Sequence, residues 1–198
     1  GAFTPGRTYE RAEELGTRLA DAVLTVLPDI GTRDDIELGS VRVDWTADYR
    51  TDMESEEEII ARITHLEEFL ASKHGEHDEE WTQASIELMY KEEILENVKE
   101  ANAAEFWRRT TEVQAIRIGD AVLVALPGEV FVQLGLAIKE ASSFPFTFIA
   151  GYANDNLGYI PTAEAFAEGG YEVATARFAK ETGAKLVHAA GQCLQSLA

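Results

Sequence analysis

The stretch VQAIRIGDAVLVALPGEVFVQLG, from Val113 to Gly135, decides the fold. Its apolar runs at 113–118 and 121–126 predict two strands, and Gly119-Asp120 between them predicts a hairpin turn. Residues 130–140 continue with apolar side chains at helical spacing, after the Pro-Gly-Glu turn at 127–129. Strands that alternate with helices predict an α/β protein.

The elements on either side of this stretch extend the same pattern. Residues 8–27 predict a first helix, and 36–45 predict a strand whose phase changes at Gly39-Ser40, which indicates a bulge or a tight turn. Residues 146–150 predict another strand, and 161–166 predict a short helix that Gly169-Gly170 ends. Residues 174–197 predict a closing helix with an interruption near Thr182-Gly183.

Residues 53–104 differ from their surroundings in composition. Apolar side chains recur at helical spacing within 59–70 and again within 86–98, on either side of the polar joint SKHGEHDEE. The many carboxylates indicate a face of the helices that is exposed to solvent. We interpret His74 and His77, which lie in the joint, as surface residues and not as a pair of zinc ligands. We therefore expect a mixed β-sheet flanked by helices, a single α/β unit over 1–198, with an acidic helical hairpin inserted at 53–104.

Composition narrows the classes of protein. The 198 residues carry a formal net charge of -19, which argues against nucleic acid and anionic membranes as partners. A single cysteine, Cys193, excludes an intrachain disulfide, and no apolar run approaches the roughly 20 residues that span a bilayer. The sequence begins with Gly1, so we expect the natural N-terminus to lie upstream, and a cytoplasmic and a secreted location both stay open.

Polar residues at the ends of the predicted strands are the candidates for chemistry. Glu129 is either a metal ligand or acid/base group, or a helix N-terminal glutamate that the helix dipole stabilises. Asn154 and Asp155 are typical of a structural turn. Tyr159 in the following loop and Tyr171 after two glycines could each bind a metal or donate a hydrogen bond. No GxSxG, HExxH, GxGxxG or Walker A motif supports another enzyme class.

The order of three motifs adds a resemblance. PGE at 127–129, N-x4-YIPT at 154–162 and GGYE at 169–172 together resemble the neutral/alkaline ceramidase family, in particular its short bacterial members. The resemblance implies a zinc-dependent amidohydrolase on a mixed α/β scaffold, acting on N-acylsphingosine (ceramide) or a related N-acyl compound. It implies Glu129 and Tyr159 as zinc ligands and Tyr171 as hydrogen-bond donor to the substrate carbonyl, with Asn154 and Asp155 supporting the site loop.

The same resemblance implies that one half of the enzyme lies outside this chain. The family's two zinc histidines and its serine segment belong to its N-terminal half, and none of the four histidines here stands in a matching context. We therefore expect the N-terminal half as a partner, an exposed apolar surface that a homodimer could cover, and little or no zinc binding and amide hydrolysis by this chain alone. A non-catalytic binding or assembly domain and an amidase for a non-lipid substrate are the alternatives.

Overall fold

The computed structural model describes residues 8–73 and 78–198, so His74 and His77 lie outside the described residues. The chain divides into two compact units, Gly1–Ile36 and Glu37–Ala198. In the first, helix α1 (Tyr9–Val26) begins at Thr8, whose hydroxyl accepts a hydrogen bond from the Arg11 amide, and the short helix η1 (Leu27–Asp29) follows it. This agrees with the helix predicted over 8–27. Whether both units belong to one domain of the whole protein stays a prediction.

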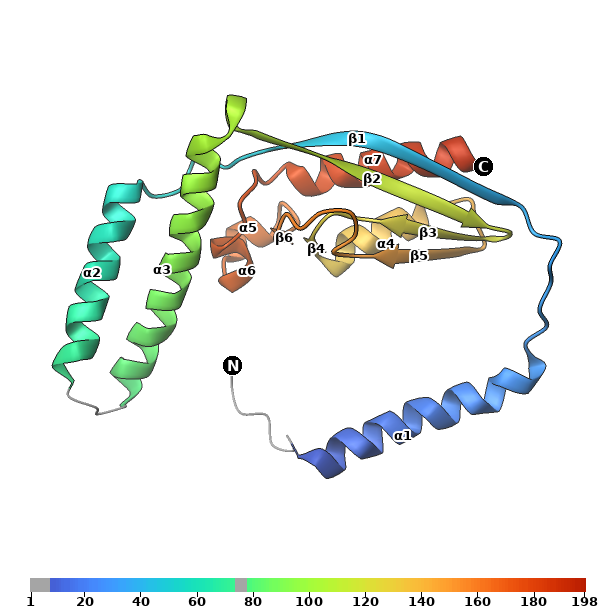
Figure 1. Cartoon of the computed structure of the whole chain (residues 1–198), viewed down its shortest axis with the longest axis horizontal. Coiled ribbons are helices and arrows are strands. Elements are labelled where there is room, and N and C mark those ends of the chain that lie inside the picture. Colours follow the sequence, from blue (N-terminus) through green and yellow to red (C-terminus); the bar gives the residue numbers. More distant parts are fainter. Residues whose placement is uncertain (1–7, 74–77) are drawn as a thin grey trace. The chain divides into compact units, whose positions relative to one another are not determined.

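A four-stranded mixed sheet forms the frame of the second unit (Figure 1). Strands β1 (Leu38–Asp48), β2 (Arg108–Ile118), β3 (Ala121–Ala125) and β5 (Phe146–Ala150) lie in the order β1-β2-β3-β5. The first two pairings are antiparallel and the third is parallel, which confirms the expected mixed sheet. The predicted turn between β2 and β3 is also confirmed, with Gly119 at φ 61°.

The predicted bulge at Gly39-Ser40 is wrong. The register of β1 against β2 runs without a break from Leu38 opposite Ile118 to Asp48 opposite Arg108. The first residues of β1 are mainly exposed, whereas Trp45 and Ala47 near its end are buried. Apolar residues at the start of the strand therefore need not alternate in phase with those at its end, and no bulge is required.

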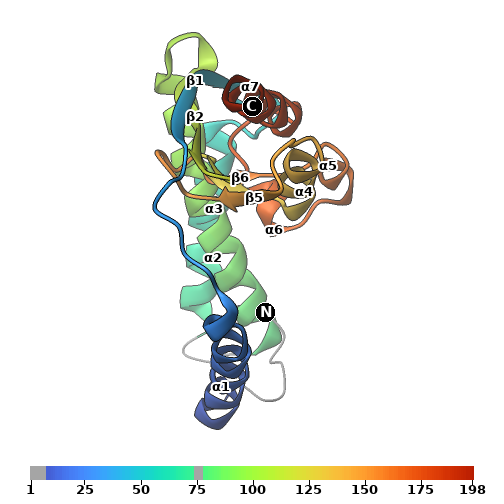
Figure 2. The ribbon, with the colours of Figure 1, turned by 90° about the vertical axis from the view of Figure 1, so that its right-hand side faces the viewer.

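Two helices cover one face of the sheet, α4 (Val132–Glu140) and α7 (Thr182–Leu197), as Figure 2 shows in end view. Alternate residues of β2 and β3 point into this face and form the core with both helices: Val113, Ala115, Val122, Val124, Leu134, Ile138, Leu186 and Ala190. The predicted closing helix over 174–197 is wrong in its first part. A short α6 (Tyr171–Ala174) is followed by non-helical residues 175–181, and α7 begins at the predicted interruption.

The opposite face of the sheet exposes apolar side chains. Alternation along each strand and the pairing register place five of them on this outer face: Leu38, Ile118, Leu123, Phe146 and Phe148. Phe146 and Phe148 are 59% and 56% exposed. An exposed apolar surface of this kind marks a contact area for another chain segment or another protein.

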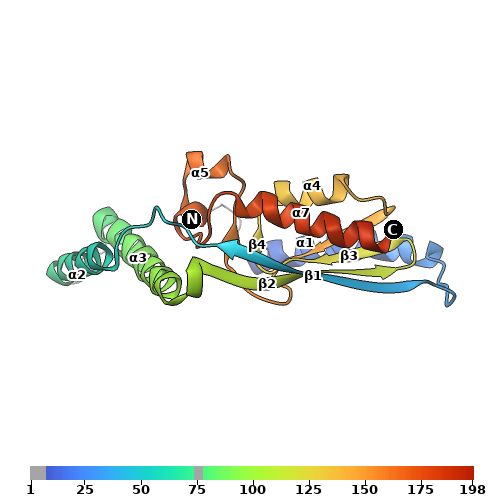
Figure 3. The ribbon, with the colours of Figure 1, turned by 90° about the horizontal axis from the view of Figure 1, so that it is seen from above.

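The expected pair of helices is present and packed together at the end of β1 and β2 (Figure 3). Helix α2 (Glu56–Ser72) begins with a capping box, in which Ser55 and Glu58 bind each other's backbone amides. Arg62 of α2 donates two hydrogen bonds of 2.7 Å to Glu87 of α3 (Glu79–Ala103). A short helix, η2 (Glu105–Trp107), links α3 to β2. Within the described residues, none of the helices combines the length and apolarity that a membrane crossing needs.

Candidate functional site

The Pro-Gly-Glu turn brings Glu129 into a second, smaller sheet. Strand β4 (Glu129–Val130) pairs in parallel with β6 (Tyr159–Ile160), so that Glu129 lies directly opposite Tyr159. The Glu129 amide donates to the Gly158 carbonyl at 2.8 Å. The prediction that a helix starts at Val130 and that Tyr159 lies in a loop is therefore wrong in detail, because α4 begins only at Val132. Glu129 is thus a strand residue outside the first turn of α4.

Gly128 makes this close crossing possible. A Cβ atom at position 128 would lie 2.7 Å from the Gly158 carbonyl oxygen and 3.2 Å from Ile160 Cδ1. Backbone cannot move aside as the end of a flexible side chain can, so any side chain here forces β4 and β6 apart. The requirement for glycine in this turn follows from the packing of the two strands that carry Glu129 and Tyr159.

We expect Gly128→Ala to destabilise the chain by about 1–3 kcal/mol, the usual cost of overpacking a tight contact. Urea unfolding followed by circular dichroism measures the change. Gly191→Ala is the matched control, since nothing lies within 4 Å of its Cβ position and it sits in α7, where alanine is favoured over glycine by ~1 kcal/mol. Equal effects of the two variants would contradict the packing argument.

Two tyrosines interact with the Glu129 carboxylate, as their raised pKa values indicate. The pKa of Tyr159 lies above its ordinary value, because burial disfavours the phenolate and because Glu129 adds negative charge and a hydrogen bond. The pKa of Tyr152 is also raised, mainly by its hydrogen bond with Glu129. No lysine or arginine in 8–73 or 78–198 forms an ion pair with Glu129. This carboxylate therefore faces phenols, and its negative charge is not neutralised by a basic side chain of that part of the chain.

Tyr171 completes the cluster from a different direction. It opens α6 directly after Gly170, whose φ of 102° suits glycine and turns the chain into the helix. The Tyr171 ring meets the Tyr159 ring edge-on, with 5.6 Å between centroids. Its hydroxyl donates to Glu93 of α3 at 3.1 Å, and burial together with this carboxylate raises the pKa of Tyr171 to about 12. The structure thus brings the three predicted site residues side by side.

An open pocket of about 460 Å³ lies over these strands, and Glu129, Tyr152, Tyr159 and Glu172 are among its lining residues. The polar side chains of this lining are carboxylates and phenols, and Tyr171 is not among the lining residues. Tyr152 and Glu172 were not among the residues that the sequence indicated. Tyr152 is hard to find in advance because its backbone is left-handed, with φ 53°, and only that turn directs its side chain toward Glu129.

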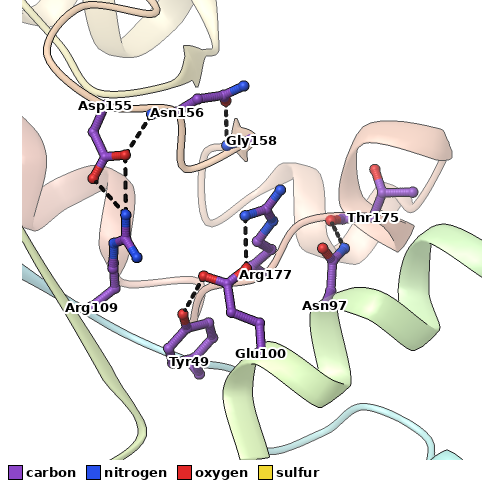
Figure 4. A network of polar contacts seen from close by, with 9 residues as sticks. All are labelled: Tyr49, Asn97, Glu100, Arg109, Asp155, Asn156, Gly158, Thr175 and Arg177. Carbon is purple, nitrogen blue, oxygen red and sulfur yellow. Dashed lines mark hydrogen bonds and ion pairs between the residues drawn. The ribbon is translucent and has the colours of Figure 1, made fainter. Parts of the chain in front are cut away.

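The loop that leads to Tyr159 is fastened to the sheet by the two residues expected to support it, and Figure 4 shows the contact between Asp155 and Arg109. Asp155 accepts two hydrogen bonds of 3.2 Å from Arg109 of β2, and Asn154 donates to Gln114 of the same strand at 3.3 Å. The Asn156 amide donates to Asp155, and the Gly158 amide donates to the Asn156 side chain. Asn154 and Asp155 therefore act on the backbone of the loop, and their part in a reaction stays a prediction.

The donor set fits zinc in part. A carboxylate and a phenol lie opposite each other, both are oxygen ligands, and the uncompensated charge of Glu129 favours a cation. Zinc sites use at least three protein ligands, however. In the described ranges 8–73 and 78–198, no group of three or more His, Cys, Asp or Glu side chains could hold a metal ion. The two side chains alone could therefore fill at most two positions of a zinc site.

Comparison with known proteins finds a similar sequence. No protein-family model matches it. Neutral ceramidase B from Dictyostelium discoideum is 32% identical to it over 93 residues, which cover 43% of this chain and 13% of that protein. The chain spans only a small part of the length of this relative. The similarity confirms the resemblance to the neutral ceramidase family.

One solved neutral ceramidase structure has a similar fold over nearly the whole chain. The neutral ceramidase from Pseudomonas aeruginosa is 19% identical and superposes with a TM-score of 0.56, covering 98% of this chain and 34% of that chain. A ceramidase complexed with C2 is 26% identical, with a TM-score of 0.42 over 44% of this chain and 15% of that chain. Nearly the whole chain thus follows the fold of about a third of the Pseudomonas neutral ceramidase.

Proposed function

We propose that this chain is the C-terminal half of the catalytic domain of a zinc-dependent amidohydrolase that cleaves the amide of N-acylsphingosine or a related N-acyl compound. The observation that carries the proposal is the convergence of Glu129, Tyr159 and Tyr171 in a chain that is similar to neutral ceramidases. Glu129 and Tyr159 supply two zinc ligands, and Tyr171 donates a hydrogen bond to the substrate carbonyl. Two histidines from the N-terminal half complete the ligand set.

The roles follow from the chemistry of the side chains. Bound zinc polarises a carbonyl and lowers the pKa of a coordinated water toward about 7. Glu129 and Tyr159 hold the metal from adjacent strands whose register fixes their separation. Burial and Glu93 raise the pKa of Tyr171 to about 12, so this phenol keeps its proton at neutral pH and can donate it in a hydrogen bond. A donor aimed at a developing oxyanion contributes roughly 3 kcal/mol to its stabilisation.

The full-length protein tests this function. Its zinc content and its hydrolysis of N-acylsphingosine and of a short N-acyl amide are measured side by side, with and without a chelator. Bound zinc and chelator-sensitive release of sphingosine support the proposal. Hydrolysis of the short amide alone supports an amidase for a non-lipid substrate. Absence of both activities from a folded, zinc-loaded protein overturns the proposal and favours a binding or assembly domain. In the isolated chain, isothermal titration is expected to detect weak zinc binding or none.

The outer face of the sheet, formed by Leu38, Ile118, Leu123, Phe146 and Phe148, is the proposed contact surface toward the N-terminal half. Covering it removes apolar area from water, at about 25 cal/mol per Å². In the isolated chain a second copy is expected to cover the same face, because the same apolar area is then exposed on both copies.

We expect the isolated chain to form dimers in sedimentation equilibrium, and Phe148→Lys to weaken them by at least about tenfold, since a lysine there must be desolvated in the interface. Met89→Lys is the control, because Met89 is also exposed and apolar, at 53%, but lies on α3. A monomer at all concentrations, or equal weakening by both variants, would contradict this assignment of the face.

A further inference from the structure

Four side chains of α3 contact the segment that carries Tyr171. Tyr90, Glu93, Asn97 and Glu100 follow one another at spacings of three, four and three, which places them on one face of the helix. Each of them binds a residue between 171 and 177, as described below. The face of α3 that the acidic composition assigns to solvent is therefore a contact surface over nearly three turns of the helix.

The first two contacts reach Tyr171 itself. The rings of Tyr90 and Tyr171 lie 4.7 Å apart at their centroids, tilted by 33°. The Glu93 carboxylate accepts a hydrogen bond from the Tyr171 hydroxyl, with 3.1 Å between the two oxygens. A tyrosine hydroxyl carries one proton and rotates about its C–O bond, so an acceptor in a fixed place sets its direction. Tyr90 thus fixes the ring of Tyr171 and Glu93 fixes its hydroxyl.

The other two contacts hold the residues that follow Tyr171, one through a backbone carbonyl and one through a side chain (Figure 4). Asn97, only 4% exposed, donates to the Thr175 carbonyl at 3.0 Å. Glu100 accepts hydrogen bonds from Arg177 at 3.0 Å and from Tyr49 at 2.8 Å. Because a buried carbonyl without a partner costs free energy, the Asn97 bond fixes the place where α6 ends. The segment is held at both ends by one rigid helix.

We propose that α3 positions Tyr171 for the reaction, and that Glu93 is the residue that sets its hydroxyl. This rests on the proposed function, in which Tyr171 donates to the substrate carbonyl. Glu93 touches Tyr171 through its hydroxyl and acts through it, so it is a positioning residue. A substrate oxygen replaces Glu93 as the acceptor when it arrives, and until then the carboxylate keeps the phenol oriented within the site.

Kinetics of the full-length protein on N-acylsphingosine test this role. Misplacing a reacting group by ~1 Å costs about 10²-fold in rate. We therefore expect Glu93→Ala to lower kcat by ten- to a hundredfold while KM changes little, and Glu93→Gln, which keeps an acceptor oxygen, to restore most of the loss. In a Tyr171→Phe background the effect of Glu93→Ala disappears, because the hydroxyl through which it acts is gone. Glu92→Ala, an exposed neighbour on the same helix, is the control.

Additive losses from Glu93→Ala and Tyr171→Phe, or a wild-type rate in Glu93→Ala, overturn the proposal. A structural defect alone would give additive losses, so the double-variant cycle separates the two roles. The cycle also separates this inference from the proposed function, which fails when the wild-type protein hydrolyses no amide at all.

Hydrogen exchange of the chain provides a readout without activity. The amides of Ala174 and Thr175 donate within α6, to Gly170 and Tyr171. We expect Glu93→Ala and Asn97→Ala to speed exchange in peptides that cover 171–178 and to leave β2 and β3 unchanged, whereas Glu92→Ala changes neither. Unchanged exchange in 171–178 for both variants overturns the proposal, whatever the enzyme assay gives.

Discussion

Replacing Glu129 by glutamine is expected to remove the proposed amidase activity of the full-length protein almost completely. Glutamine has the size of glutamate and keeps the backbone pairing of β4 with β6, but it lacks the charge that attracts a cation. Bound zinc supplies several kcal/mol of transition-state stabilisation, and each ~1.4 kcal/mol is a factor of ten, so the expected fall in kcat is on the order of 10³-fold. Zinc content by atomic absorption is expected to fall with it.

The matched control is Glu172→Gln, which removes a charge of the same sign from the same pocket. Glu172 is exposed at the start of α6, and this variant is expected to keep its zinc and most of its rate. Tyr159→Phe, which removes the second proposed ligand opposite Glu129, is expected to lower zinc content as Glu129→Gln does. A Glu129→Gln protein that keeps both zinc and rate would contradict the assignment of Glu129 as a ligand.

The longer helices and strands can be predicted from local sequence because their hydrophobic patterns extend over many residues. Alternation through 113–126 and the Gly119-Asp120 turn are sufficient for the β2–β3 hairpin, and the spacing of apolar residues is sufficient for α2 and α3. Strands β4 and β6 are two residues long, and only their contact with each other makes them strands. No local pattern can encode that, so Glu129 appears in the sequence as the start of a helix.

The candidate site likewise contains residues that the sequence predicts and others, such as Glu93, that it does not. The order of the three motifs predicts Glu129, Tyr159 and Tyr171 as site residues, and the pairing of β4 with β6 brings the first two together. Glu93 could not be singled out by composition, since α3 holds many carboxylates and Glu92 and Glu93 have the same chemistry. The available signal is spacing: Glu93 lies in register with Tyr90 and Asn97, an aromatic and an amide that a wholly solvated face does not require.

Phe178→Ala is expected to destabilise the chain by about 3–5 kcal/mol, the usual cost of truncating a buried phenylalanine. Phe178 is 2% exposed, its ring lies 4.7 Å from that of Tyr49, and it forms a β-bridge with this residue. It thereby fixes residues 175–181, which are not helical and follow directly on α6. Urea unfolding of the chain measures the loss.

This loss is large compared with the whole free energy of unfolding, which is only about 5–15 kcal/mol for a domain. The control is Phe148→Ala, because Phe148 is 56% exposed and its truncation below the dimer concentration is expected to change stability by less than about 0.5 kcal/mol. A loss below about 1 kcal/mol for Phe178→Ala would mean that the segment repacks without its anchor. Hydrogen exchange in the Phe178→Ala variant then tests whether Phe178 also holds the segment that carries Tyr171. We expect faster exchange of the amides in 171–178 and unchanged exchange in β2 and β3.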